Sequence, residues 1–128
     1  MKRIFVYGLL RPGFEGAGLL GDARPLGAAT TSGLLYDLGG YPGLVPGDGV
    51  VHGEICEVDD TRLPALDAFE DYNPADPAGS LYIRTTVIAW LVASGEAIPV
   101  QAYRYNRPVP EHAWIPDGDY ARYAAGRG

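Results

Sequence analysis

The sequence predicts an α+β fold, a small β-barrel of mixed or antiparallel strands with one main helix. Five short segments are rich in β-branched and aromatic residues and are separated by turn signals. Two of them are joined by a four-residue turn, which is typical of a hairpin. The chain has 18 glycines and 11 prolines in 128 residues, which favours many turns over long helices. This length corresponds to a single domain, residues 1–128.

The predicted strands follow from local composition. The first is a β-branched and aromatic run that ends at Gly8. The second contains a central glycine, and Gly53 in the third indicates a bulge or a close backbone approach. The fourth is the strongest, and residues 93–96 form the turn to its hairpin partner. In chain order the predicted strands are Lys2–Tyr7, Ala28–Asp37, Val50–Val58, Leu81–Val92 and Ala97–Tyr105.

One helix is expected over Asp60–Asp71. Either Asp60 or Thr61 can cap its N-terminus, and Pro64 is tolerated in its first turn. The Pro- and Gly-containing stretch Asn73–Ser80 ends it. The remaining Gly- and Pro-rich stretches are predicted loops or turns, namely Arg11–Gly27, Gly39–Gly49 and the start of the tail Arg107–Gly128. The tail is expected to finish with a short helical turn at Asp119–Ala125.

The charge balance excludes several function classes. Ten basic and 16 acidic residues give a formal net charge of −6, whereas nucleic acids and anionic membranes attract basic surfaces. The apolar N-terminal run has no small-residue cleavage site behind it, and no segment approaches the roughly 20 apolar residues of a membrane span. We therefore expect a cytoplasmic protein without nucleic-acid or membrane partners.

Cysteine and histidine are too few for the common metal and triad sites. Cys56 is the single cysteine, which excludes an internal disulfide and a cysteine-based zinc cluster. His52 and His112 form no HExxH or HxH pair, and the chain has no G-x-S-x-G motif. We expect Cys56 to pack as a small apolar residue and His52 to be an ordinary strand residue. No metal site is predicted.

Glu70 is the strongest candidate for chemistry. At about 100° per residue, its side chain falls within the apolar arc of Leu63, Leu66 and Phe69. A carboxylate in that position needs a partner or a raised pKa, and a raised pKa suits a general acid or base near neutral pH. Two structural alternatives stay open. The helix end frays and Glu70 points to water, or Glu70 forms a structural salt bridge with Arg84.

Two further segments are candidates for substrate binding. The turn after the first strand, Tyr7-Gly8-Leu9-Leu10, can gather backbone N–H groups into a concavity that binds a carboxylate. Its structural alternative is an ordinary exit from a strand. Tyr82 and Arg84 lie on one face of the fourth strand, where they can orient a carboxylate or a substrate. Their alternative is the polar face of a half-exposed strand.

Six short motifs occur in order along most of the chain. They are Phe5–Arg11 (FVYGLLR), Tyr41–Leu44 (YPGL), Val51–Ile55 (VHGEI), Leu66–Tyr72 (LDAFEDY), Tyr82–Arg84 (YIR) and Ile115–Tyr120 (IPDGDY). In this order they resemble the gamma-glutamylcyclotransferase-like family, of the gamma-glutamylamine cyclotransferase type. The resemblance implies a compact mixed β-barrel with short flanking helices. It also implies an enzyme of the transferase or lyase type, which cyclises a small-molecule γ-glutamyl amine or amide to 5-oxoproline and releases the amine.

The resemblance also implies roles for particular residues. The family's catalytic glutamate matches Glu70, and its substrate-cradling turn matches Tyr7, Gly8, Leu9 and Leu10. One carboxylate can take a proton from the attacking α-amine and then protonate the leaving nitrogen, so no cofactor is needed. The nucleophile is part of the substrate, and the enzyme must therefore mainly hold an attack-ready conformer. Tyr82 is expected to orient Glu70 or the substrate.

Two positions depart from the family pattern. Leu9 stands where Ser or Thr is usual, and Asp71 stands where the helix often ends in Gly. The Asp71 charge is expected to raise the pKa of Glu70 further. Leu9 keeps open a second hypothesis, a non-catalytic module that binds a carboxylate-bearing small molecule in the same pocket. A third is an amidohydrolase in which Glu70 activates water. An open cavity of ligand size at Glu70 would favour the enzyme.

Overall fold

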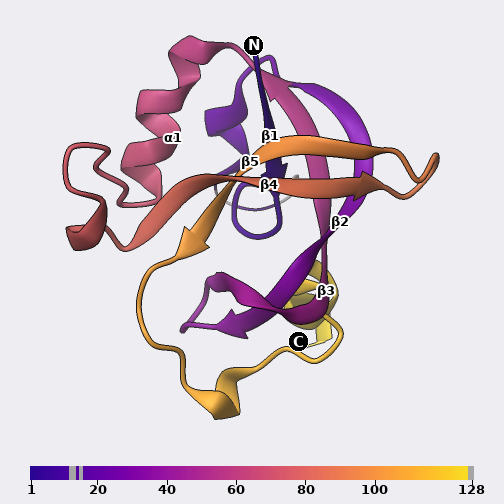
Figure 1. Cartoon of the computed structure of the whole chain (residues 1–128), viewed down its shortest axis with the longest axis vertical. Coiled ribbons are helices and arrows are strands. Elements are labelled where there is room, and N and C mark those ends of the chain that lie inside the picture. Colours follow the sequence, from indigo (N-terminus) through magenta and orange to yellow (C-terminus); the bar gives the residue numbers. More distant parts are fainter. Residues whose placement is uncertain (12–13, 15, 127–128) are drawn as a thin grey trace.

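A closed β-barrel forms the centre of the molecule in the computed structural model, which describes residues 1–11, 14 and 16–126 (Figure 1). Its strand order is β1-β3-β2-β4-β5. Neighbouring strands are antiparallel except β1 and β5, which pair in parallel through Ile4 and Gln101. The strands are β1 (Lys2–Val6), β2 (Arg24–Asp37), β3 (Pro42–Val58), β4 (Tyr82–Leu91) and β5 (Ala97–Tyr105). The predicted α+β fold with a small mixed barrel is therefore confirmed.

Two short α-helices accompany the barrel. The helix α1 (Leu63–Phe69) follows a 3-10 turn at Asp60–Arg62, and α2 (Tyr120–Gly126) ends the described chain. Figure 1 shows α1 beside β1 on the outside of the barrel and the C-terminal helix, in yellow, behind β3. Further 3-10 turns occupy Ala17–Leu20, Pro77–Gly79 and Glu111–Ala113. The 3-10 turn that leads into α1 is capped by the Asp59 carboxylate, which accepts from the Thr61 N–H at 2.9 Å, so the predicted caps Asp60 and Thr61 were one or two residues late.

The segment Gly39–Gly49 was wrongly predicted as a turn. Most of it belongs to β3, which forms a long hairpin with β2. The pairing shifts between Ser32 and Leu34, where the single residue Gly33 faces residues 46–49. This irregularity accommodates the Pro-Gly-Asp-Gly sequence without ending the strand, because a bulge leaves extra residues unpaired. The strand β2 likewise begins before the predicted Ala28, at Arg24. Residues 12, 13 and 15 of the predicted loop and residues 127 and 128 of the tail lie outside the described part.

The barrel strands bury side chains on both faces where α1 covers them. On β1, Phe5 belongs to the inner cluster of the barrel, and Ile4 and Val6 belong to an outer cluster under α1. This alternation is the two-residue period of a strand. Leu66 of α1 is fully buried in the outer cluster, and Cys56 packs there as a small apolar residue, as predicted. Packing of Leu66 fixes the helix, and with it the residue that follows its last turn.

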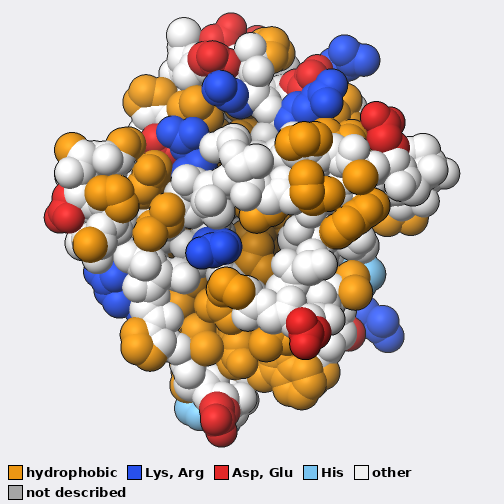
Figure 2. Space-filling view, in the orientation of Figure 1, with side chains coloured by type: hydrophobic (Ala, Val, Ile, Leu, Met, Phe, Trp, Pro, Cys, Tyr) orange, Lys and Arg blue, Asp and Glu red, His pale blue; other side chains and the backbone are white. Residues whose placement is uncertain are grey.

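The surface shows both kinds of charge. On the face drawn in Figure 2, acidic and basic side chains alternate around the outline, and hydrophobic side chains gather in the lower half. Among the described residues, no helix is both long and apolar enough to cross a membrane.

Candidate active site

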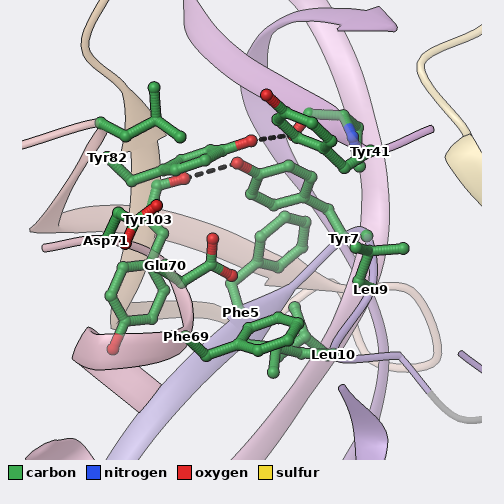
Figure 3. Close-up of a pocket in the computed structure, with 14 residues that line it drawn as sticks. Phe5, Tyr7, Leu9, Leu10, Tyr41, Phe69, Glu70, Asp71, Tyr82 and Tyr103 are labelled. Atoms are coloured by element: carbon green, nitrogen blue, oxygen red, sulfur yellow. Dashed lines mark hydrogen bonds between the residues drawn. The ribbon is translucent and has the colours of Figure 1, made fainter. Parts of the chain in front are cut away.

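A cavity of about 280 Å³ opens between the turn after β1, the end of α1 and the start of β4 (Figure 3). Its volume is near the lower end of the range for small-molecule sites, about 300 Å³. Of the residues that the sequence analysis selected for catalysis or substrate binding, Arg84 lies outside the lining and all the others contribute to it. They are Tyr7, Gly8, Leu9, Leu10, Glu70 and Tyr82. No Lys, Arg or His occurs among the described lining residues.

Glu70 is positioned by the way in which α1 ends. The Asp71 N–H donates to the Ala68 carbonyl at 3.2 Å, and the Tyr72 N–H donates to the Asp67 carbonyl at 2.8 Å. These two bonds form a Schellman motif, in which the residue after the C-cap adopts a left-handed conformation. Asp71 is that residue, with a φ of 53°. The chain therefore turns sharply after Glu70, which is the C-cap itself.

The Glu70 carboxylate faces the cavity. Figure 3 shows it directed toward the rings of Phe5 and Tyr7. Burial is the main cause that raises the Glu70 pKa from its ordinary value of 4.5 to about 7, and the charge of Asp71 raises it further. The predicted effect of Asp71 is confirmed. Within the described part of the chain, the Glu70 side chain has no hydrogen-bond or salt-bridge partner. The alternative in which the helix frays and Glu70 points to water is correct only in part. The helix ends at Phe69, but Glu70 remains half-buried.

Arg84 pairs with another carboxylate, so the alternative of a Glu70–Arg84 salt bridge is wrong. Arg84 Nε donates to Asp67 Oδ1 at 2.9 Å and Nη2 donates to Asp67 Oδ2 at 3.3 Å. The Tyr103 hydroxyl donates to the same Asp67 Oδ1 at 2.6 Å. These bonds join the last turn of α1 to β4 and β5. They leave the carboxylate of Glu70 available to a ligand.

The hydroxyls of Tyr7 and Tyr82 at the cavity are already hydrogen-bonded to the protein backbone. Tyr7 donates to the Tyr103 carbonyl at 2.5 Å and accepts from the Leu44 N–H at 3.2 Å. Tyr82 donates to the Pro42 carbonyl at 2.5 Å, so its proton is not directed to Glu70 (Figure 3). Burial raises the pKa of both Tyr7 and Tyr82, and both therefore remain neutral hydroxyls.

The turn after β1 presents backbone groups to the cavity. The Arg11 N–H donates to the Gly8 carbonyl at 3.0 Å, which closes the turn. Within the described part of the chain, the N–H groups of Gly8, Leu9 and Leu10 have no backbone partner. Gly8 also lies against the ring of Pro42, since a Cβ at Gly8 would be 2.5 Å from Pro42 Cγ. This contact explains the requirement for glycine here.

Sequence reasoning missed part of the site. Asp67 was not selected, although it lies three residues before Glu70 and thus close to the same side of a helix. Tyr41, Pro42 and Tyr103 line the cavity from segments distant in sequence. The motif YPGL contributed to the resemblance without a role for Tyr41 or Pro42, and Tyr103 belonged to no motif, so only the closed barrel identifies these three as wall residues. Among the described residues, no group of three or more His, Cys, Asp or Glu side chains is arranged to hold a metal ion.

Comparisons with known sequences show the family of the chain. Residues 4–122 match the model of a family described as gamma-glutamyl cyclotransferase, AIG2-like. A gamma-glutamylcyclotransferase family protein, YtfP of Escherichia coli K12, is 36% identical over 124 residues, which are 92% of this chain and 95% of the relative. The gamma-L-glutamyl-butirosin B gamma-glutamyl cyclotransferase of Niallia circulans is 39% identical over 109 residues, 84% of this chain and 69% of the relative.

Solved structures show the same fold. An AIG2-like protein from Mus musculus superposes with a TM-score of 0.77 at 31% identity, covering 94% of this chain and 88% of that protein. The solution structure of Escherichia coli ytfP superposes with a TM-score of 0.67 at 35% identity, covering 95% of this chain and 98% of that protein.

Proposed function

The chain belongs to the gamma-glutamyl cyclotransferase, AIG2-like family, and we propose that it cyclises a γ-glutamyl amine to 5-oxoproline and releases the amine. Glu70 acts as the general base and then as the general acid. The observation that carries the proposal is the Glu70 carboxylate, half-buried at a cavity of about 280 Å³ and without a protein partner in the described part. A pKa near 7 allows it to accept and return a proton at neutral pH.

The reaction is an intramolecular acyl transfer. Glu70 takes a proton from the substrate's α-amine, and the free amine attacks the γ-carbonyl carbon. A C–N bond forms in the five-membered ring and the C–N bond to the departing amine breaks. Glu70 then returns the proton to the leaving nitrogen, and the surplus proton on the ring nitrogen passes to the released amine, which departs as an ammonium ion. Atoms and charges balance without an oxidant, a reductant or a cofactor.

The turn after β1 binds the substrate's α-carboxylate. The N–H groups of Gly8, Leu9 and Leu10 are the donors, since the cavity has no basic side chain in its described lining. Tyr7 and Tyr82 form the wall against which the glutamyl chain folds. Because both hydroxyls already donate to carbonyls, each can offer a lone pair to the substrate's ammonium or amide N–H. Such fixed walls favour the attack-ready conformer.

A second candidate is a non-catalytic module that holds a carboxylate-bearing small molecule. Leu9 favours it, because a leucine in the cradle supplies no side-chain hydroxyl for a substrate. A cavity that admits ligands suits both functions, but a module has no need of a half-buried carboxylate with a raised pKa. The enzyme is therefore the better-supported function.

The test is incubation with a panel of γ-glutamyl amines and dipeptides, followed by mass spectrometry. We expect 5-oxoproline and free amine with the wild type and none above background with Glu70→Gln. The exposed Glu96→Gln is the matched control and should retain activity. An active Glu70→Gln variant would reject the mechanism. Release of free glutamate instead would assign Glu70 to water activation, and silence across the panel together with ligand binding would favour the module.

A further inference from the structure

Asp71 occupies a backbone position that normally favours glycine. Its φ of 53° lies in the left-handed region, and it is the sole non-glycine residue with a positive φ in the described part of the chain. Two hydrogen bonds of the helix end fix this conformation, and the Asp71 carbonyl accepts from the Leu81 N–H at 3.0 Å. Asp tolerates the region better than most residues but less well than glycine. A carboxylate here is therefore expected to have a role that glycine cannot supply.

Asp71 borders two adjacent hollows. One is the cavity that contains Glu70, and the other is a more open hollow of about 620 Å³ on the side of residues 72–80. Asp71 and Leu81 belong to the lining of both. Asp71 and Leu81 therefore form the border between the two hollows, and a substrate that reacts at Glu70 and extends its amine portion toward this border brings that portion close to Asp71. Figure 3 shows Asp71 next to Glu70, on the side of the cavity away from Leu9 and Leu10.

The charged side chains near this border are mostly negative. The cavity lining contains Glu70 and Asp71 and, among its described residues, no cationic side chain. The second hollow contains the cation Arg107, whose guanidinium donates to the carbonyls of Gly79 at 3.1 Å and Asn106 at 2.9 Å, and the two carboxylates Asp71 and Asp76. The Asp71 carboxylate is exposed and has no ion pair in the described part of the chain. It is thus available to a positive group on a substrate.

We propose that Asp71 is a specificity-determining residue that favours γ-glutamyl substrates whose amine portion carries a second, positively charged amino group. This inference rests on the proposed function. The amine portion leaves past Asp71 and Leu81 toward the second hollow, and the carboxylate attracts its distant ammonium. The bonds that form and break are those of the cyclisation itself. Every released amine carries an ammonium at the nitrogen that was bonded to the γ-carbonyl. The selection by Asp71 therefore acts on the second amino group of the amine portion.

The size of the effect follows from the exposure of Asp71. Because water screens an exposed carboxylate, the attraction of a cation a few ångströms away amounts to roughly three- to tenfold in kcat/KM. An anionic group in the same place is disfavoured by a similar factor. The preference is expected to decrease as the salt concentration increases.

Three substrates of equal chain length test the inference. They are the γ-glutamyl amides of 1,4-diaminobutane, butylamine and 4-aminobutanoate, whose distant ends are positive, neutral and negative. With the wild type we expect kcat/KM to fall in that order, by roughly three- to tenfold at each step at low salt. Asp71→Asn keeps the shape of the side chain and tolerates a positive φ, and it should reduce both steps to less than twofold. The exposed Asp48→Asn, outside both linings, should preserve the wild-type order.

The readout is the ratio between substrates measured on the same variant at one pH. A change in the Glu70 pKa affects all three substrates alike and cancels in this ratio. Cyclisation of all three at equal kcat/KM by the wild type would overturn the inference and leave the proposed function standing. If Asp71→Asn kept the wild-type ratios of kcat/KM among the three substrates, the inference would likewise be overturned and the proposed function would stand. Absence of 5-oxoproline from all three substrates would overturn the proposed function, and the inference with it.

Discussion

Arg84 and Asp67 form a two-pronged ion pair one helical turn before Glu70, with N···O distances of 2.9 and 3.3 Å. The pair is partly shielded from water, since the Arg84 side chain is 20% exposed and the Asp67 side chain is 8% exposed. The Tyr103 hydroxyl donates a further hydrogen bond to the Asp67 carboxylate. This cluster attaches the end of α1 to two barrel strands, and it therefore fixes the position from which Glu70 extends into the cavity.

Removal of Arg84 is expected to be strongly destabilising. Arg84→Met leaves the Asp67 carboxylate buried without its cation, and we expect the free energy of unfolding at pH 7 to fall by about 3 kcal/mol in urea denaturation. The matched control is Arg122→Met, since Arg122 and Asp117 are exposed and 3.7 Å apart. Its loss should stay within about 0.5 kcal/mol. Equal losses in the two variants would contradict a structural role for the Arg84–Asp67 pair.

Glu70→Gln is expected to stabilise the fold at alkaline pH. The unfolded carboxyl loses its proton near pH 4.5 and the folded one near pH 7, so the folded state binds more protons between these values. The stability of the wild type therefore falls as the pH rises through this window. Glutamine has no such titration. Urea denaturation should show Glu70→Gln more stable by about 2 kcal/mol at pH 8 and nearly unchanged at pH 4.

The control for this stability prediction is Glu96→Gln, in the exposed turn between β4 and β5. We expect it to change the free energy of unfolding by less than about 0.5 kcal/mol at either pH. A Glu70→Gln advantage that does not grow between pH 4 and pH 8 would argue that Glu70 is not held in a desolvated position.

The rate of cyclisation is expected to depend on the protonation of Glu70. The base must be ionised, so kcat/KM should rise with pH to a plateau with an apparent pKa near 7. Asp71→Asn removes the neighbouring negative charge, and the rise should move to lower pH. Burial remains, so the rise should not return to the pKa of a free carboxyl. A pH profile in Asp71→Asn identical to that of the wild type would show that the Asp71 charge does not reach Glu70.

Gly8→Ala is expected to disturb the cradle. The new Cβ would lie 2.5 Å from Pro42 Cγ and 2.9 Å from Cδ, so the ring or the turn must move. Because the Pro42 carbonyl also accepts the Tyr82 hydroxyl, the displacement reaches the opposite wall. We expect KM to rise at least about tenfold and the stability to fall by about 1–3 kcal/mol.

Gly18→Ala is the control for the cradle variant. A Cβ at Gly18 has no heavy atom within 4 Å, apart from those of its own chain neighbours and of its own 3-10 turn. Alanine should therefore leave KM unchanged and alter the stability by less than about 1 kcal/mol. If Gly8→Ala and Gly18→Ala had the same KM, substrate binding would not depend on the close contact between Gly8 and Pro42.

Local sequence was sufficient for much of the fold. The strand Ala97–Tyr105 was predicted at its observed ends, because a hairpin turn precedes it and a proline follows shortly after. The prediction was wrong at Gly39–Gly49, where the barrel extends β3 through a stretch rich in glycine and proline. The pairing of β2 and β3 on both sides of that stretch outweighs the local turn preference, and the bulge formed by residues 46–49 opposite Gly33 accommodates the extra residues.

By itself, the sequence determined which carboxylate stands out, since helical periodicity places Glu70 among apolar side chains. Only the tertiary structure decided the partner of Arg84. Periodicity gives the direction of a side chain on its own element but not the distance to a residue on another, and the barrel brings Arg84 to Asp67 rather than to Glu70. The same holds for the pKa of Glu70. Its principal cause is desolvation, which depends on strands and turns folding around the carboxylate and not on its neighbours in the chain.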